Sequence, residues 1–353
     1  MKALILAGGS GSRLRPFSHS TPKQLVPVAN KPVIFHALEA IAETGITEVG
    51  VIVSGEGEAV KAAVGTGARF GLAVTYLSQD RPRGLAHCVL IAGDFLGDED
   101  FLMFLGDNVF VGGITAPMAE FRARRPAAQL VVTKVADPSQ YGIAEVDDDG
   151  RVTGLQEKPK QARSDLAVTG VYFFTPRIHE AVASIGVSAR GELEITDAVQ
   201  ALVDGGHEVR ARFFSGYWKD TGTLVDLLAC NRALLGDIRP ETRGSIDART
   251  ELIGLVRVEE GARVSGSRII GPAVIGAGST VTDSSIGAYT SLGEGCRVED
   301  AEIENSILLD RASVRGVRPL RGSIIGRDGE VRRSEAGAVR LLVGDDSKVE
   351  VLR

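Results

Sequence analysis

Apolar residues in the first two thirds of the chain follow two alternating patterns. Short runs that are apolar throughout predict strands at 3–6, 49–53, 74–77, 101–105 and 130–135, and helical spacing predicts helices at 32–42 and 84–95. Fully apolar strands separated by helices are typical of a parallel sheet that is covered on both faces. Ligands bind beyond the carboxyl ends of such strands, so the residues that follow them are the candidates for chemistry.

A different period begins after the polar segment 237–242. Apolar residues then recur every five or six positions, and glycine follows several of them. They are Val258, Val264, Ile270, Ile275, Val281, Ile286, Leu292, Val298, Ile303, Leu308, Val314, Leu320 and Ile325. This period is the hexapeptide signature of a parallel β-helix, and so long a series disfavours ordinary hairpins. We therefore expect an α/β chain of two domains, at 1–236 and 245–353.

Composition narrows the class of protein. A length of 353 residues suits two domains, and no apolar run approaches the roughly 20 residues that span a membrane. The net charge of −6 argues against a nucleic-acid partner, which would require a basic surface. Cys88, Cys230 and Cys296 are far apart and have no metal-ligand spacing. We expect packing roles for them in a reducing cytoplasm.

A glycine-rich turn follows the first predicted strand. Gly8, Gly9, Ser10 and Gly11 would let backbone N–H groups approach phosphate oxygens closely. The turn is not a dinucleotide fingerprint, because Leu14 stands where a third glycine is required, and the chain has no Walker loop. A purely structural turn is the alternative interpretation.

Two cations come after this turn. Arg13 follows it directly, and Lys23 lies in a proline-rich stretch that disfavours a helix. Fixed cations stabilise the negative charge that builds on phosphate oxygens in a transition state. A single arginine or lysine is usually a solvated surface charge, but two cations after a glycine turn at the ligand end of a sheet favour a triphosphate site.

Carboxylates occur at three further places. Asp107 ends an apolar strand and Asp220 lies in the segment 216–222, and Mg²⁺ typically takes one or two carboxylates. Each aspartate could instead be a cap or turn residue.

Glu157 and Lys158 follow a predicted hairpin whose turn is 147–150. This pair could bind the hydroxyls and the phosphate of a sugar phosphate, or could be an exposed ion pair of little energetic value.

Taken together, these segments resemble the sugar nucleotidylyltransferases. The motif Gly-Gly-Ser-Gly-Ser-Arg-Leu-Arg-Pro at 8–16 and the segments 22–25 and 27–32 carry the resemblance, which extends through 84–87, 105–108, 157–159, 216–222 and the hexapeptides. The long-form thymidylyltransferases of this family are the most similar. The resemblance implies a Rossmann-like, mostly parallel sheet followed by a left-handed β-helix. It also implies a single displacement in which an oxygen of glucose 1-phosphate attacks the α-phosphorus of dTTP.

The resemblance also implies roles for individual residues. Arg13 and Lys23 would be catalytic. The nucleotide would contact Gly8, Gly9, Ser10, Gly11, Arg13, Gln79 and Gly84. The sugar phosphate would contact Tyr141, Gly142, Glu157, Lys158 and Val168. Asp107 and Asp220 would hold Mg²⁺. Because an amide such as that of Gln79 can pair with thymine, uracil or adenine, residue type alone does not choose the base, and uridylyl-, adenylyl- and guanylyltransferases stay alternatives.

Two other classes of function fit less well. A β-helix acyltransferase would use a histidine as general base, but none of the five histidines lies in the repeat region. A catalytically inactive sensor would lack Lys23, Asp107 or Asp220, but all three residues are present. We therefore expect the β-helix to be structural, oligomerising or regulatory in a homo-oligomer without nucleic-acid or membrane partners. A chain ending near Leu235 is expected to keep some activity.

Overall fold

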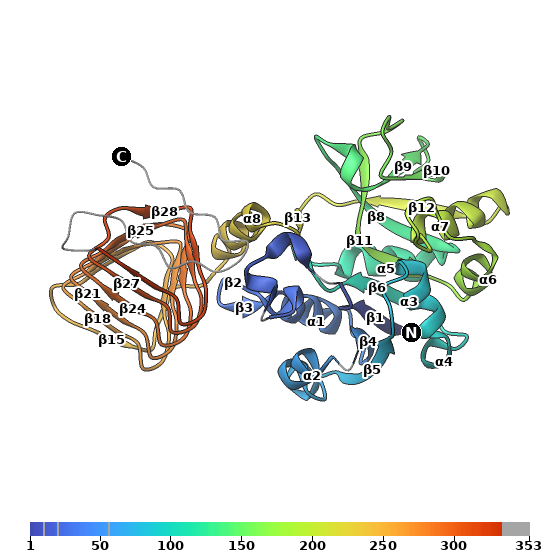
Figure 1. Ribbon diagram of the computed structural model, residues 1–353. Helices are drawn as coiled ribbons and strands as arrows, with labels where there is room; N and C mark the ends of the chain where they lie inside the picture. Colours follow the sequence, from blue (N-terminus) through green and yellow to red (C-terminus); the bar gives the residue numbers. More distant parts are fainter. Residues whose placement is uncertain (10, 20, 56, 334–353) are drawn as a thin grey trace. The chain divides into compact units, whose positions relative to one another are not determined.

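The computed structural model describes residues 1–9, 11–19, 21–55 and 57–333 of the chain (Figure 1). The chain divides into two compact units. The first comprises Met1–Ser10 and Ile34–Asp220, and the second comprises Gly11–Val33 and Thr221–Arg353. The segment that follows the glycine turn is therefore grouped with the repeat region rather than with the sheet. The sequence-based boundary between 236 and 245 stays a prediction.

A nine-stranded sheet forms the centre of the first unit, with β10-β9-β11-β6-β1-β4-β5 in order, β8 beside β11 and β12 beside β8. The strands are β1 (Lys2–Leu6), β4 (Glu48–Ser54), β5 (Ala73–Gln79), β6 (Phe101–Leu105), β8 (Ala128–Lys134), β9 (Gly142–Val146), β10 (Val152–Glu157), β11 (Leu166–Phe174) and β12 (Val209–Phe213). The helices are α1 (Val33–Glu43), α2 (Glu58–Val64), α3 (Leu85–Ile91), α4 (Gly93–Leu96), α5 (Thr115–Arg124), α6 (Arg177–Ser184) and α7 (Ile195–Asp204).

Most predicted elements of this unit are present, with two differences. The predicted helix at 84–95 is divided at Ala92 into α3 and α4. Gly93 follows this break, and glycine disfavours a continuous helix. The sheet is parallel along β6-β1-β4-β5, but β11 runs antiparallel to β6, β8 and β9. All nine positions of β11 are buried, so its apolar sequence did not reveal its direction.

A short two-stranded ladder lies apart from the main sheet. It pairs β7 (Asn108–Val111) with β13 (Tyr217–Asp220) in antiparallel register. β7 follows β6 after a two-residue turn, so this ladder begins at the carboxyl end of a central parallel strand. It is the element that brings two distant aspartate segments together.

The repeat region forms three parallel sheets of short strands in the second unit. One sheet contains β14 (Glu241–Thr242), β17 (Val256–Val258), β20 (Ala273–Ile275), β23 (Thr290–Leu292), β26 (Ile307–Leu308) and β29 (Ile324–Ile325). Another contains β15 (Ser245–Ile246), β18 (Arg263–Ser265), β21 (Thr280–Thr282), β24 (Arg297–Glu299), β27 (Ser313–Arg315) and β30 (Glu330–Arg332). The third contains β16 (Glu251–Ile253), β19 (Arg268–Ile270), β22 (Ser285–Ile286), β25 (Glu302–Glu304) and β28 (Leu320–Arg321). The arrangement is consistent with the expected left-handed β-helix.

Most of the predicted inward positions are buried, but one is wrong. Ile270 is half-buried, and its neighbour Ile269 is the fully buried residue of β19. Successive side chains of a strand point to opposite faces, so only one residue of the Ile269-Ile270 pair can point inward. Register with the next coil decides which one, and there Ile269 pairs with Ile286. Leu320 and Ile325, near the end of the stack, are only partly buried.

The second unit also contains α8 (Leu224–Leu235) and the elements of the segment 11–33. These are the 3₁₀ turns η1 (Ser12–Leu14), η2 (Phe17–His19) and η3 (Lys23–Leu25) and the strands β2 (Pro27–Val28) and β3 (Lys31–Pro32). A last 3₁₀ pair, η4 (Ala68–Phe70) and η5 (Pro138–Gln140), belongs to the first unit. No described helix is long and apolar enough to cross a membrane.

Candidate active site

Gly8 lies against Gln79 at one edge of the sheet. The parallel strands β1, β4 and β5 end together there, and Gly8 follows β1 while Gln79 ends β5. A Cβ atom at Gly8 would lie 2.8 Å from Gln79 Oε1 and 3.2 Å from Ser54 Oγ. The Ser54 hydroxyl also donates a hydrogen bond to the carbonyl of Gly8. A side chain at this position would therefore push against the Gln79 amide, which glycine leaves undisturbed.

The amide of Gln79 is held by helix α3. Gln79 is 4% exposed, and its Nε2 lies 3.2 Å from His87 Nδ1 and 3.4 Å from Cys88 Sγ. Burial raises the pKa of the Cys88 thiol to about 12, so the thiol is protonated at neutral pH. With Nε2 donating toward α3, the Nδ1 atom of His87 acts as the acceptor. His87 is a residue that sequence reasoning missed as a partner of Gln79, although it stands in the same motif.

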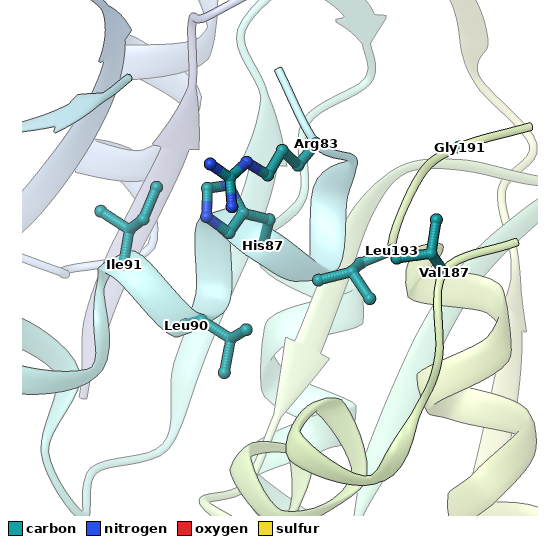
Figure 2. A pocket seen from close by; sticks show the side chains of 7 residues that line it. All are labelled: Arg83, His87, Leu90, Ile91, Val187, Gly191 and Leu193. Carbon is teal, nitrogen blue, oxygen red and sulfur yellow. The ribbon is translucent and has the colours of Figure 1, made fainter. Parts of the chain in front are cut away.

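Gly84 is required for close backbone packing. It has φ +103°, and a Cβ atom there would lie 2.3 Å from the carbonyl oxygen of Leu193. That oxygen accepts a hydrogen bond of 3.1 Å from the Ala86 N–H. Beside this contact, α3 and the segment 187–193 enclose a pocket of about 520 Å³. Figure 2 shows its lining residues, which are Arg83, His87, Leu90, Ile91, Val187, Gly191 and Leu193.

The two aspartates expected to hold a metal lie at one end of the β7–β13 ladder, where Asp220 ends β13 and Asp107 immediately precedes β7. Asp220 pairs with Asn108, the residue after Asp107. Hard divalent cations such as Mg²⁺ take carboxylate oxygens, and this donor set fits that preference. No group of three or more His, Cys, Asp or Glu side chains suited to a metal occurs among the described residues. A Mg²⁺ ion held by Asp107 and Asp220 would therefore need phosphate oxygens or water to complete its shell.

Asn108 orients this corner of the site, a role that sequence reasoning missed. It is 2% exposed, its Nδ2 donates to Asp107 Oδ1 at 2.9 Å, and its Oδ1 accepts from Trp218 Nε1 at 2.7 Å. A Cβ atom at Gly170 would lie 2.6 Å from the Asn108 amide carbon. Asn108 thus connects the Asp107 carboxylate to β13 and packs against the backbone of β11.

Glu157 lies at the end of β10 within a cluster of polar side chains. Its carboxylate accepts hydrogen bonds from Arg190 at 2.9 Å and from Thr196 at 3.1 Å, whereas Lys158 is 3.8 Å away. Burial, and then the nearby carboxylate of Glu194, raise the pKa of Glu157. The segment 190–196, which is not among the candidate site residues of the sequence, supplies these nearest partners of Glu157.

Tyr141 and Gly142 connect the Glu157 cluster to the ladder. The rings of Tyr141 and Trp218 are 5.4 Å apart, and Lys219 donates to the Tyr141 hydroxyl at 3.4 Å. A Cβ atom at Gly142 would lie 2.7 Å from the Thr196 methyl group, so only glycine fits there. Tyr141 therefore lies beside β13, the strand that ends at Asp220, whereas Gly142 packs against the Glu157 cluster.

The other two residues expected to contact the sugar phosphate, Lys158 and Val168, lie in irregular backbone. Lys158 has φ +42°, an uncommon conformation for a residue with a side chain, and its N–H donates to the Tyr141 carbonyl at 3.0 Å. Val168 is buried in β11, where the pairing with β8 shifts register between Val168 and Tyr172. Such an irregularity releases backbone groups from the ladder.

The two cations expected to be catalytic belong to the second unit. Arg13 lies in η1 and Lys23 begins η3. Gly11 has φ +64°, and a Cβ atom there would lie 2.9 Å from Lys23 Cβ, so this loop glycine and the lysine are packed together. Gly9 is exposed after β1, and Ser10 lies outside the described residues.

Comparison with known proteins identifies the family of the chain. Residues 2–236 match the nucleotidyl transferase family model. The chain is 56% identical to glucose-1-phosphate thymidylyltransferase of Streptomyces antibioticus, over 99% of both chains. It is 38% identical to the low-salt glycan biosynthesis nucleotidyltransferase Agl11 of Haloferax volcanii, over 99% of this chain and all of the relative.

Two solved structures are similar to this chain in fold. One from Bacillus anthracis, described as a candidate glucose-1-phosphate thymidylyltransferase in complex with sucrose, is 36% identical, with a TM-score of 0.63 over 69% of this chain and 98% of that one. A UDP-glucose pyrophosphorylase complexed with UDP-glucose, at 23% identity and a TM-score of 0.61, shares the fold over 67% of this chain and 98% of that one. The chain belongs to the nucleotidyl transferase family.

Proposed function

We propose that this enzyme transfers dTMP from dTTP to glucose 1-phosphate, forming dTDP-glucose and releasing pyrophosphate. The observation that carries the proposal is the β7–β13 ladder, in which Asp220 pairs with Asn108, the residue after Asp107, and Trp218 contacts Tyr141. Two full-length relatives, from two Streptomyces species, are named glucose-1-phosphate thymidylyltransferase, which supports the choice of substrates.

The reaction is a single displacement at phosphorus. A phosphate oxygen of glucose 1-phosphate forms a bond to the α-phosphorus of dTTP, and the bond to the bridging oxygen breaks with its electron pair leaving on pyrophosphate. Mg²⁺ held by Asp107 and Asp220 would neutralise phosphate charge and align the two substrates. Arg13 and Lys23 would stabilise the negative charge that grows on the leaving group.

Glu157 and Lys158 would bind the two ends of glucose 1-phosphate. The Glu157 carboxylate would accept hydrogen bonds from sugar hydroxyls, while the Lys158 ammonium group would pair with the phosphate. The bonds from Arg190 and Thr196 fix the carboxylate in place. A preorganised acceptor loses less entropy when the sugar binds.

Gln79 would recognise the base, with the backbone of Gly84 beside it. The bonds to His87 and Cys88 restrict the amide to one orientation. This orientation presents Oε1 on the side of Gly8. An amide alone does not distinguish thymine from uracil, so a uridylyltransferase is the second candidate function.

A substrate matrix tests the proposal. dTTP and each ribonucleoside triphosphate are mixed with glucose 1-phosphate and Mg²⁺, and pyrophosphate release is measured, with the Asp107→Asn variant as the control for contaminating activity. We expect the highest kcat/KM with dTTP. A higher value with UTP would assign the uridylyl reaction instead, and no release with any nucleotide would refute the proposal.

We also propose a homo-oligomeric enzyme of the cytoplasm. The buried thiols of Cys88, Cys230 and Cys296 support a reducing compartment. Gel filtration with light scattering on the purified chain tests the oligomeric state.

A further inference from the structure

Asn231 on α8 is fully buried and connects three separate segments of the second unit. Its Oδ1 accepts hydrogen bonds of 2.9 Å from the Ala29 N–H and 2.9 Å from the Ser291 hydroxyl. Its Nδ2 donates to the carbonyl of Tyr289 at 3.0 Å. One side chain thus joins the segment 11–33, the helix α8 and a coil of the β-helix. Buried amides that are satisfied in this way fix the geometry of their partners, because breaking a bond leaves a buried polar group without one.

The segment bound by Asn231 is a tight hairpin turn. Ala29 and Asn30 join β2 to β3 with φ values of 48° and 63°. Positive φ at both positions is the backbone pattern of two-residue hairpins, where asparagine and glycine are favoured and alanine is not. Asn30 donates from Nδ2 to the Leu292 carbonyl at 2.5 Å. The two turn residues are therefore both held against β23 and α8, which supports a conformation that alanine alone disfavours.

Hydrogen bonds constrain the short segment between Lys23 and this turn. The 3₁₀ turn η3 begins at Lys23, and the Val26 N–H donates back to the Lys23 carbonyl at 3.2 Å before β2 begins at Pro27. The Val33 N–H closes the hairpin onto the Val26 carbonyl at 3.3 Å. A displacement of the turn would therefore move the backbone of Lys23 as well.

A second contact ties the same segment to the β-helix. The Phe17 ring lies 3.5 Å from the position of a Cβ atom at Gly326. Phe17 is in η2, between Arg13 and Lys23 in the chain. The β-helix thus touches the cation-bearing segment at two separated points.

We propose that Asn231 is a positioning residue for catalysis and that the β-helix is the platform against which it holds the segment carrying Arg13 and Lys23. The proposal rests on the proposed roles of these two cations. It refines the expectation that a chain ending near Leu235 keeps some activity: such a chain would keep Asn231 but lose Tyr289, Ser291 and Leu292.

The test compares Asn231→Ala with a matched control in the full-length chain. We expect Asn231→Ala to lower kcat by about ten- to a hundredfold, because small misplacements of catalytic groups have effects of that size, and to change the KM for glucose 1-phosphate less than about twofold. The control is Ser306→Ala. Ser306 is fully buried in the β-helix, and its hydroxyl bonds the Glu304 carbonyl and the Ser323 N–H rather than Asn231 or the hairpin turn, so Ser306→Ala removes none of the Asn231 bonds. Its kcat should be unchanged. An equal loss in both variants would mean general destabilisation and would overturn the proposal.

A rescue separates positioning from simple stabilisation. Glycine adopts positive φ without strain, so Ala29→Gly lets the turn form with less help from Asn231. We expect Ala29→Gly to leave the wild-type kcat unchanged and to restore part of the kcat that Asn231→Ala loses. No restoration would overturn the idea that Asn231 acts through this turn. If Asn231→Ala does not fold, Ser291→Ala removes one bond to Asn231 and should show a smaller loss of the same kind.

A readout independent of activity separates this proposal from the proposed reaction. Hydrogen exchange of the amides in 21–33 should be faster in Asn231→Ala than in the wild type and in Ser306→Ala. Faster exchange with unchanged kcat would overturn the positioning role, and unchanged exchange would overturn the anchoring itself. Failure of the wild-type chain to release pyrophosphate would refute the proposed reaction alone.

Discussion

Asp220 stands directly opposite Asn108 in the β7–β13 ladder, and Asn108 in turn donates to the carboxylate of Asp107. Strand pairing therefore sets the relation between two aspartates that are far apart in the sequence. Asp107→Asn and Asp220→Asn should each lower kcat by at least about a hundredfold, because each change removes a ligand charge but keeps side-chain volume.

The metal role is checked by titrating Mg²⁺ at saturating substrates, with circular dichroism to confirm folding. Asp148→Asn, in the exposed turn between β9 and β10, is the matched control and should behave like wild type. Near wild-type turnover of either ladder variant at high Mg²⁺ would remove that residue from the metal site.

The hydrogen bond between Gln79 and His87 predicts a specific effect of His87 on the KM for the nucleotide. His87→Ala removes the acceptor at 3.2 Å from Gln79 Nε2 and should raise the KM for dTTP several-fold, with little change in the KM for glucose 1-phosphate. His87→Asn, which offers an amide oxygen near the position of Nδ1, should restore part of the loss. Steady-state kinetics with each substrate varied in turn gives both constants. Equal increases in the two KM values would argue against a role through Gln79.

Lys158 and Lys23 should differ in the step that they affect. Lys158→Ala should mainly raise the KM for glucose 1-phosphate, because Lys158 follows β10 beside the Glu157 cluster. Lys23→Ala should mainly lower the single-turnover rate at saturating substrates, because a fixed cation stabilises the transition state more than the ground state. Rapid-quench measurements of pyrophosphate formation separate the two effects. The assignment would be contradicted if both variants changed only the apparent affinity for dTTP.

The raised pKa of Glu157 predicts how stability depends on pH. Burial and the carboxylate of Glu194 disfavour the ionised form of Glu157 in the folded state. The folded state therefore binds the proton more tightly than the unfolded state does. The wild type should therefore lose stability as pH rises from the ordinary glutamate value of about 4.5 through the higher folded value.

Glu157→Gln removes this titration while it keeps a hydrogen-bond acceptor. The Tm of the variant relative to wild type should therefore increase between pH 4.5 and 8, although its KM for glucose 1-phosphate rises. Thermal unfolding at several pH values measures the difference. A Tm difference that is constant across this range, or that falls with pH, would show that the carboxyl titrates normally.

The sequence by itself determined the class of the protein and most of its elements. Apolar runs such as those of β6 and β4 are local signals, since strands buried on both faces need apolar residues at every position. The hexapeptide period was equally clear, because each coil of a β-helix repeats the same inward positions. The glycine turn and the motifs around Asp107, Glu157 and Asp220 were visible for the same reason: each is a short stretch of chain.

Only the tertiary structure decided which residues meet. The antiparallel direction of β11, the inward position of Ile269 rather than Ile270, and the pairing of Asp220 with Asn108 depend on register between distant strands. The contacts of Asn231 with Ala29 and Ser291 join residues 202 and 60 positions apart in the chain. No local pattern encodes them, because strand register and buried hydrogen bonds are fixed by the packing of the whole chain, where each polar group must find a partner as water is excluded.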